Sequence, residues 1–300
     1  MAEGRLEEEV KAEGIIAALI TPYDEQDTVD TKELRRLVNH LIERGVHGLF
    51  VVSNAGEFYA LSDYEKELIL NVVVEEADGR VPIYFGSGAI TTRDAVRLTK
   101  MAAENGADAV SVITPYFIRF SEGELYDHYK AISEAADVPV LVYSNPSLTG
   151  ISVSAKLMTK LVQIENLIGI KDSSGDLALT QEYIAVSPKL SVLAGRDGLI
   201  LSTLIHGGTG AISSTANVAP SLAVEIYEAF RSGDLEGAAA AQNKLATLRQ
   251  AFRLGTFPSV LKEALIQQGF EVGPPRKPAR PLTLENRSRL RDVLASLELL

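Results

Sequence analysis

Short apolar runs alternate along the chain with longer segments in which apolar residues recur every three to four positions. Continuously apolar runs are typical of strands buried on both faces of a parallel sheet, and the longer segments are typical of amphipathic helices. The predicted strands are 14–21, 48–53, 81–86, 109–114, 139–144, 167–171, 190–194 and 210–213. The predicted helices are 31–44, 63–77, 92–105, 122–136, 153–164, 177–186, 198–206 and 220–231.

Local signals support several of these helix boundaries. Ser62 three residues before Glu65, and Thr91 three residues before Asp94, are N-terminal capping patterns. Glycine is favoured just past a helix end because it adopts left-handed backbone conformations without steric cost. Such glycines follow four of the predicted helices, at Gly45, Gly79, Gly106 and Gly207.

The repeated strand–helix order predicts an α/β fold, a (β/α)8 TIM barrel with additional C-terminal helices, since such barrels typically take about 250 residues. A doubly wound sheet is the structural alternative. It would normally carry a glycine-rich turn after its first strand, where this chain has Thr21-Pro22-Tyr23-Asp24. That sequence cannot make the turn, and the barrel is therefore favoured.

Three parts of the chain are expected. Residues 1–13 form an N-terminal extension without the apolar core of a signal peptide, 14–234 form the barrel, and 235–300 form a helical extension packed on it. A proline-rich stretch at 274–281 interrupts this extension. It is interpreted as a rigid tether along the barrel, with a basic docking arm as the alternative.

Composition narrows the functional classes. The chain is 46% hydrophobic and 23% charged, which is ordinary for a soluble globular protein with a sizeable core. Its formal net charge of −11 argues against nucleic acid and anionic membranes as partners. The absence of cysteine excludes disulfides and thiolate catalysis, and no apolar run has the length of a membrane helix. A cytoplasmic protein is expected.

Active sites of such barrels lie at the C-terminal ends of the strands, so a lysine at a strand end is a candidate. Lys171 ends the predicted strand 167–171, whereas the other lysines fall on amphipathic helices, in turns or in the tails. Lysine is rarely buried, and an amine removed from water can attack a carbonyl to form a Schiff base. The alternative is an ion pair with Asp172 or another carboxylate at the strand end.

A second candidate lies on the preceding strand. Tyr143 is near the end of the predicted strand 139–144, where its hydroxyl can relay protons if a base or a cation is close. A single tyrosine is more often a packing residue with a bonded hydroxyl. Because neighbouring strands place Tyr143 beside Lys171, a catalytic function is favoured for both.

Other strand ends carry polar or small residues. The segment 53–58 follows the second strand, and its backbone amides could cradle a carboxylate or form an ordinary tight turn. Arg196 and Asp197 follow the seventh strand, and Ile212 and Ser214 lie at the end of the eighth. The polar groups there suit a hydroxylated substrate, although each could instead cap a helix.

No metal is predicted at this site. The histidines are His40, His47, His128 and His206, and they fall on helices or before strands, with no pair at ligand spacing. A metal-dependent aldolase that polarises its substrate with histidine-bound zinc is therefore disfavoured.

Several of these segments recur together in a known superfamily. The chain resembles the pyruvate-dependent class I aldolases of the dihydrodipicolinate synthase and N-acetylneuraminate lyase superfamily, from about residue 14 to about residue 269. The residues carrying the resemblance are Thr21-Pro22, Asn54-Ala55-Gly56-Glu57, Thr114-Pro115-Tyr116, Tyr143-Ser144-Asn145-Pro146, Gly169-Ile170-Lys171-Asp172, Gly195-Arg196-Asp197 and Ile212-Ser213-Ser214-Thr215.

The resemblance implies roles for individual residues. It implies a covalent Schiff base on Lys171, with Tyr143 as proton shuttle and no cofactor. The loop at Asn54 and Ala55 would bind the pyruvate carboxylate. Further substrate contacts are expected from Tyr116, Arg196, Asp197, Ile212 and Ser214. The expected partners are a small 2-oxo acid, pyruvate, and an aldehyde, in a homo-oligomer that family analogy makes a tetramer.

Three departures from the synthase pattern favour another branch. Asn54-Ala55 stands where synthases usually have two threonines, Phe117 where they have a second tyrosine lent across a dimer interface, and Leu148 where they have an arginine. Leucine cannot hold a carboxylate, and neither phenylalanine nor alanine can relay a proton. The chain looks more like the branch that cleaves 4-hydroxy-2-oxoglutarate or 2-keto-3-deoxy sugar acids.

The expected activity is that of a lyase cleaving a 4-hydroxy-2-oxo acid, reversibly, to pyruvate and an aldehyde. Two enzymatic alternatives use the same chemistry: dihydrodipicolinate synthase and a sugar-acid dehydratase. A barrel that has lost catalysis and binds an oxo acid as a sensor is the alternative from another class. Retention of Lys171 and Tyr143 speaks against the sensor.

Overall fold

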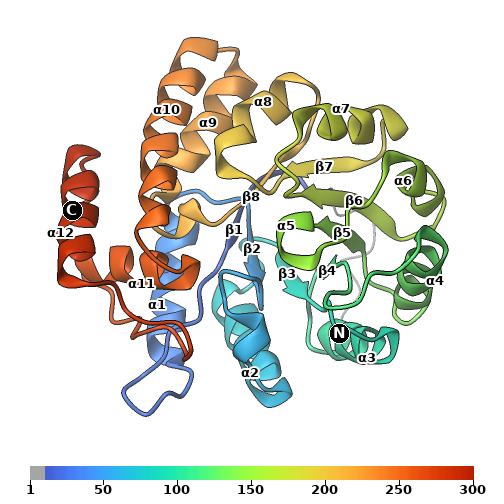
Figure 1. Cartoon of the computed structure of the whole chain (residues 1–300), viewed down its shortest axis with the longest axis horizontal. Coiled ribbons are helices and arrows are strands. Elements are labelled where there is room, and N and C mark those ends of the chain that lie inside the picture. Colours follow the sequence, from blue (N-terminus) through green and yellow to red (C-terminus); the bar gives the residue numbers. More distant parts are fainter. Residues whose placement is uncertain (1–10) are drawn as a thin grey trace.

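Eight parallel strands close into a barrel in chain order, with β8 pairing back onto β1 (Figure 1). The structure is a computed structural model and describes residues 11–300, so most of the predicted N-terminal extension lies outside the described residues. The predicted (β/α)8 barrel is confirmed. The strands are β1 (Gly14–Ala18), β2 (Gly48–Val51), β3 (Ile83–Gly86), β4 (Ala109–Ile113), β5 (Val140–Ser144), β6 (Leu167–Asp172), β7 (Ser191–Ala194) and β8 (Gly210–Ser213).

Helices surround the barrel, and three more follow its last strand–helix unit. In residues 11–300 none of them is long and apolar enough to cross a membrane. The barrel helices are α1 (Thr31–Glu43), α2 (Asp63–Ala77), α3 (Thr92–Glu104), α4 (Glu122–Ser133), α5 (Pro146–Thr149), α6 (Ala155–Leu161), α7 (Leu177–Val186), α8 (Ile200–Ile205) and α9 (Pro220–Ser232). The C-terminal helices, α10 (Leu235–Ala251), α11 (Phe257–Gln267) and α12 (Leu284–Ser296), gather on one side of the barrel, where α10 packs against α9 (Figure 1).

Helix α1 shows how the sequence pattern becomes packing. Asp30 caps the helix by accepting a hydrogen bond from the amide of Glu33. The residues buried against the barrel recur at helical spacing and include Leu34, Leu37, Val38 and Leu41. The predicted caps of α2 and α3 at Ser62 and Thr91 are also present.

Strand β1 is shorter than predicted. It ends at Ala18, whereas the apolar run continues to Thr21. Just past the strand, the amide of Ile20 donates to Asn217 Oδ1 and not to a neighbouring strand. The chain therefore leaves the sheet early although its residues remain apolar and buried.

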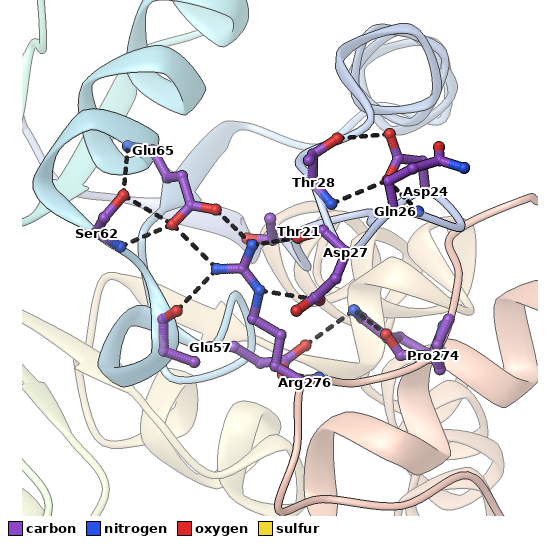
Figure 2. A network of polar contacts seen from close by, with 12 residues as sticks. Thr21, Asp24, Gln26, Asp27, Thr28, Glu57, Ser62, Glu65, Pro274 and Arg276 are labelled. Atoms are coloured by element: carbon purple, nitrogen blue, oxygen red, sulfur yellow. Dashed lines mark hydrogen bonds and ion pairs between the residues drawn. The ribbon is translucent and has the colours of Figure 1, made fainter.

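Within the proline-rich stretch, the side chain of Arg276 contacts the loops of the barrel. Figure 2 shows Arg276 between Glu65 at the start of α2 and Asp27 in the loop after β1. Its Nη1 donates to Glu65 Oε2 at 3.0 Å and to the carbonyl of Ala60 at 2.8 Å. The guanidinium also lies 4.3 Å from the centre of the Tyr23 ring. The extension is thereby fixed to the loops at the C-terminal ends of β1 and β2.

This contact predicts a pH-dependent stability. The hydrogen bond from Arg276 lowers the pKa of Glu65 from 4.5 to about 2, with a further contribution from Ser62. Because the folded-state pKa is lowered, the stabilisation is present above about pH 5 and is lost as the pH falls toward 2. We expect Arg276→Gln to reduce the free energy of unfolding at pH 7 by about 1–2 kcal/mol, allowing for solvent screening.

The measurement is urea unfolding of both proteins at several pH values between 7 and 3. The deficit of the variant should shrink as the pH falls below 5. A deficit that stays constant over this range would show that Arg276 acts through packing and not through its charge on Glu65.

Candidate functional site

A cavity of about 190 Å³ opens at the C-terminal ends of the barrel strands. It contains every sequence-predicted site residue except Tyr116. Its volume suits a small substrate, since drug-sized pockets take about 300 Å³ or more. The lining residues are Ala18, Ser53, Asn54, Ala55, Tyr143, Asn145, Ser147, Leu148, Lys171, Ser173, Gly195, Arg196, Asp197, Ile212, Ser214, Arg249 and Phe257.

Lys171 and Tyr143 are brought together by the register of their strands. The two residues are paired neighbours in the β5–β6 ladder, so their side chains point to the same side of the sheet. Lys171 Nζ lies 4.1 Å from the centre of the Tyr143 ring and 5.0 Å from that of Phe50. Lys171 is 4% exposed and Tyr143 is 5% exposed. The predicted convergence of the two side chains is confirmed.

Asp172 does not neutralise Lys171. Successive strand residues point to opposite faces, and the carboxylate of Asp172 is engaged elsewhere. It accepts hydrogen bonds from the amide of Ser174 at 2.8 Å and from Thr180 Oγ1 at 2.6 Å. The Lys171–Asp172 ion pair that the sequence left open as the alternative is therefore not formed.

Asn145 orients the tyrosine hydroxyl and was not singled out from the sequence. Its Nδ2 donates to Tyr143 Oη at 3.0 Å, and its Oδ1 accepts from Ser147 Oγ at 2.8 Å. The second bond fixes which end of the amide faces the tyrosine. The bond to the phenol oxygen holds the tyrosine hydroxyl in place at the cavity, where it can take part in proton transfer.

The loop after β2 has the geometry of an anion cradle. The amides of Gly56, Glu57 and Phe58 turn back onto Ser53 Oγ, Asn54 O and Ser53 O, respectively. The amides of Asn54 and Ala55 make no hydrogen bond within residues 11–300. Two successive amides with free donors beside a buried lysine are suited to a carboxylate.

The opposite rim of the cavity is polar and charged. Arg196 is held by two bonds, from Nε to the carbonyl of Ser173 at 2.9 Å and from Nη2 to Ser147 Oγ at 3.1 Å. Asp197 accepts a hydrogen bond from Ser214 Oγ at 3.1 Å, and its Oδ2 lies 3.8 Å from Arg249 Nε. This rim can both donate to and accept from a hydroxylated ligand.

Two lining residues come from beyond the barrel. Arg249 lies near the end of α10, and Phe257 begins α11. The sequence gives no signal for either, because each occupies an ordinary position in a helical segment. Ser173 was also missed; it lines the cavity, and its buried hydroxyl has no hydrogen-bond partner within residues 11–300.

Tyr116 is placed outside the cavity lining. It is half-buried and packs edge-to-face against Phe58, with ring centres 6.1 Å apart. Burial raises the pKa of its phenol. The next residue, Phe117, is exposed and has a positive φ of 78°. Tyr116 therefore does not line the cavity within residues 11–300, and its contact with a substrate stays a prediction.

The histidines lie away from the cavity, as predicted. His47 accepts a hydrogen bond from the amide of Ile15 at the other end of β1, and His128 is buried in α4 with its pKa lowered to about 4 by burial. In the part of the chain described here, no cluster of three or more histidine, aspartate or glutamate side chains could hold a metal ion.

Comparison with known proteins places the chain in a family. The model of the dihydrodipicolinate synthetase family matches residues 11–297. A 4-hydroxy-tetrahydrodipicolinate synthase of Methanopyrus kandleri is 38% identical over 291 residues, covering 96% of this chain and 97% of the relative. A DapA-like lyase of Halobacterium salinarum is 37% identical, covering 96% of this chain and 94% of the relative.

Solved structures of similar proteins support the same family. A prophage protein of E. coli K12, a family member in complex with pyruvate, has a TM-score of 0.93 and 33% identity over 96% of this chain and 99% of its own. A dihydrodipicolinate synthase of Acinetobacter baumannii, also complexed with pyruvate, has a TM-score of 0.93 and 35% identity over the same shares. The chain belongs to the dihydrodipicolinate synthetase family, whose members are pyruvate-dependent carbon–carbon lyases.

Proposed function

We propose that the protein is a class I aldolase that cleaves a 4-hydroxy-2-oxo acid, reversibly, to pyruvate and an aldehyde. The observation that carries the proposal is the buried Lys171 amine, which lies against the Tyr143 ring in the lining of one cavity. Family membership supports pyruvate as the three-carbon product. A protonated imine is itself an electron sink, so this chemistry needs no cofactor.

In the proposed reaction, Lys171 Nζ adds to the C2 carbonyl and water leaves, which gives an imine. Tyr143 removes the proton of the C4 hydroxyl. The C3–C4 bond then breaks, the aldehyde forms, and the electron pair moves into the cationic imine to give an enamine. Protonation at C3 and hydrolysis of the imine release pyruvate and restore the lysine. Asn145 supports the tyrosine step because it donates to the phenol oxygen.

The loop amides of Asn54 and Ala55 are proposed to hold the carboxylate next to the reacting C2 carbon. Arg196, Asp197 and Ser214 are proposed to bind the hydroxylated aldehyde half at the opposite rim. Leu148 lines the same cavity although it is 58% exposed. An apolar side chain there offers nothing to an aldehyde carboxylate, which favours a hydroxylated aldehyde over a carboxylated one.

The second candidate is the synthase reaction, in which the same enamine condenses with aspartate semialdehyde. The names of the relatives from Methanopyrus kandleri and Archaeoglobus fulgidus favour it. In that reaction the guanidinium groups of Arg196 and Arg249 at the cavity would bind the carboxylate of aspartate semialdehyde. The two candidates share the Lys171 chemistry and differ only in the second substrate.

We expect pyruvate and borohydride to add a reduced pyruvyl group to Lys171, detected by mass spectrometry of the digested protein. Lys171→Arg should fold but be inactive, because arginine stays protonated and cannot attack a carbonyl. An adduct found only on another lysine, such as the buried Lys262, would rule out the proposed mechanism.

Tyr143→Phe should still form the adduct on Lys171, at least in part. Its turnover should fall by about 10²- to 10⁴-fold, the usual contribution of a positioned acid–base group. Steady-state kinetics on a cleavable 4-hydroxy-2-oxo acid measures this. Turnover close to that of the unmodified protein would assign the proton transfer to another group, with Ser173 as the first to examine.

The two candidate reactions are separated by their specificity constants. We expect cleavage of 2-keto-3-deoxygluconate, whose aldehyde half is hydroxylated and uncharged, to exceed condensation of pyruvate with aspartate semialdehyde. At the Leu148 position the aldehyde carboxylate meets no arginine and loses a charge-assisted hydrogen bond worth about 1.5–3 kcal/mol. Leu148→Arg should improve condensation selectively. If condensation is already the faster reaction, the synthase is the right assignment and the carboxylate binds at Arg196 or Arg249.

A further inference from the structure

A second buried lysine lies outside the cavity, beneath the loop that is proposed to hold the carboxylate. Lys262 on α11 is 1% exposed, and its Nζ forms an ion pair with Glu57 Oε1 at 2.9 Å. Glu57 is itself 0% exposed and belongs to the loop 53–58. The proposed reaction uses neither group, and neither lines the cavity.

We propose that Glu57, Lys262 and Arg276 form a clamp through which the C-terminal extension positions the carboxylate-binding loop. The inference rests on the proposed function, since it gives the loop its ligand. Glu57 is a positioning residue here. It contacts no reacting atom and acts through the loop amides of Asn54 and Ala55.

Both oxygens of Glu57 are held by the extension. Oε1 pairs with Lys262, and Oε2 accepts a hydrogen bond from the backbone amide of Arg276 at 2.9 Å. Lys262 Nζ also donates to the carbonyl of Pro274 at 3.1 Å, which ties α11 to the tether. Figure 2 shows Glu57 beside Pro274 and Arg276. The clamp therefore joins the loop after β2 to two separate parts of the extension.

The conformation of the loop shows why it needs such support. Glu57 has a φ of +57° and ψ of +39°, a left-handed conformation that L side chains disfavour by about 1–2 kcal/mol. Val52, at the other end of the loop, has a φ of +55°. Strained backbone persists where its surroundings fix it. Fixing the Glu57 side chain from two directions selects this strained turn over relaxed alternatives.

A short path leads from the clamp to the free amides. The amide of Glu57 donates to the carbonyl of Asn54 at 3.2 Å, and Thr21 Oγ1 donates to the carbonyl of Gly56 at 2.8 Å. The peptide units of Asn54, Ala55 and Gly56 are thus held between Glu57 and Thr21, in the loop after β1. A shift of Glu57 would rotate the peptide planes that present the Asn54 and Ala55 amides to the cavity.

The electrostatics of the clamp favour a charged pair over a neutral one. Lys262 Nζ lies 3.8 Å from the centre of the Tyr23 ring, whose π face attracts a cation. Burial lowers the pKa of Lys262 to about 8, and Glu57 opposes that shift. Arg276 and Asp27 are the other charged groups that act on it, and the ammonium remains the main form at neutral pH.

The test compares pyruvate with methyl pyruvate, which keeps the ketone and masks the carboxylate. The readout is the concentration of each that half-saturates borohydride trapping on Lys171, so turnover is not involved. In Glu57→Gln we expect the value for pyruvate to rise about ten- to a hundredfold, the factor for losing a well-aimed hydrogen bond to a charged group. The value for methyl pyruvate should change by less than about threefold, because its ester lacks the charge.

Two further variants keep the test decisive. Glu57→Gln leaves Lys262 buried without its counter-ion, so Glu57→Gln/Lys262→Met removes both charges at similar volume, a replacement that buried ion pairs often tolerate. It should fold and show the same selective loss. Arg287→Met is the matched control, since it breaks a 3.0 Å ion pair with Glu263 between α12 and α11 without touching the loop. It should leave both trapping values unchanged.

The outcomes are separable. An unmodified protein that takes no label on Lys171 would refute the proposed function. If that protein is labelled normally, and a folded double variant binds pyruvate equally well, the clamp is refuted while the proposed function stands. Equal losses for pyruvate and methyl pyruvate would also refute the clamp, because they would show a general distortion of the site and not a loss of carboxylate binding.

Discussion

Closure of the parallel sheet is the constraint on which the rest of the structure depends. It brings the C-terminal ends of all strands to one rim and sets the register that pairs Tyr143 with Lys171. The alternation of side chains along β6 then sends Lys171 and Asp172 to opposite faces, so the lysine keeps no carboxylate partner from its own strand. A register shift of one residue would exchange them and place an acid where the amine now lies.

The barrel alone does not complete the site. Arg249 and Phe257 line the cavity from α10 and α11. Helix α11 also carries Lys262, and Arg276 follows it in the proline-rich stretch. The extension therefore lines part of the cavity directly and, outside the cavity, contacts the loop after β2. A helical addition to a closed barrel can in this way adjust a site whose strand residues are already fixed by the sheet.

Sequence patterns predicted those features of the structure that depend on neighbouring residues in the chain. Continuous apolar runs, capping residues and strand-end positions identified the barrel, the helix boundaries and the cavity residues that follow the strands. The burial of Lys262 could not be predicted from the sequence, because burial over most of α11, from Pro258 to Leu265, arises from tertiary packing. Its partner Glu57 lies far away in the chain, so no local pattern marks the pair. The place of Arg249 at the cavity could not be predicted either, because it also arises from tertiary packing.

The position of Tyr116 could not be predicted either. The motif that contains it follows a strand, but the chain turns sharply at Phe117 and directs Tyr116 against Phe58. That turn depends on a left-handed backbone at a phenylalanine, which sequence patterns do not favour. Where local preference and observed structure disagree in this way, the surrounding packing decides the outcome.

The charge at the rim bears on the proposed specificity. Asp197 is buried and sits beside Arg249, and Arg196 is the second guanidinium at the cavity. A hydroxyl on the substrate can donate to Asp197 and accept from Arg196, so it uses both groups. A carboxylate can use only the arginines and is repelled by the aspartate, a cost that grows as water is excluded. With Leu148 on the remaining side, a neutral hydroxylated tail is the chemistry that leaves no group at this rim unsatisfied.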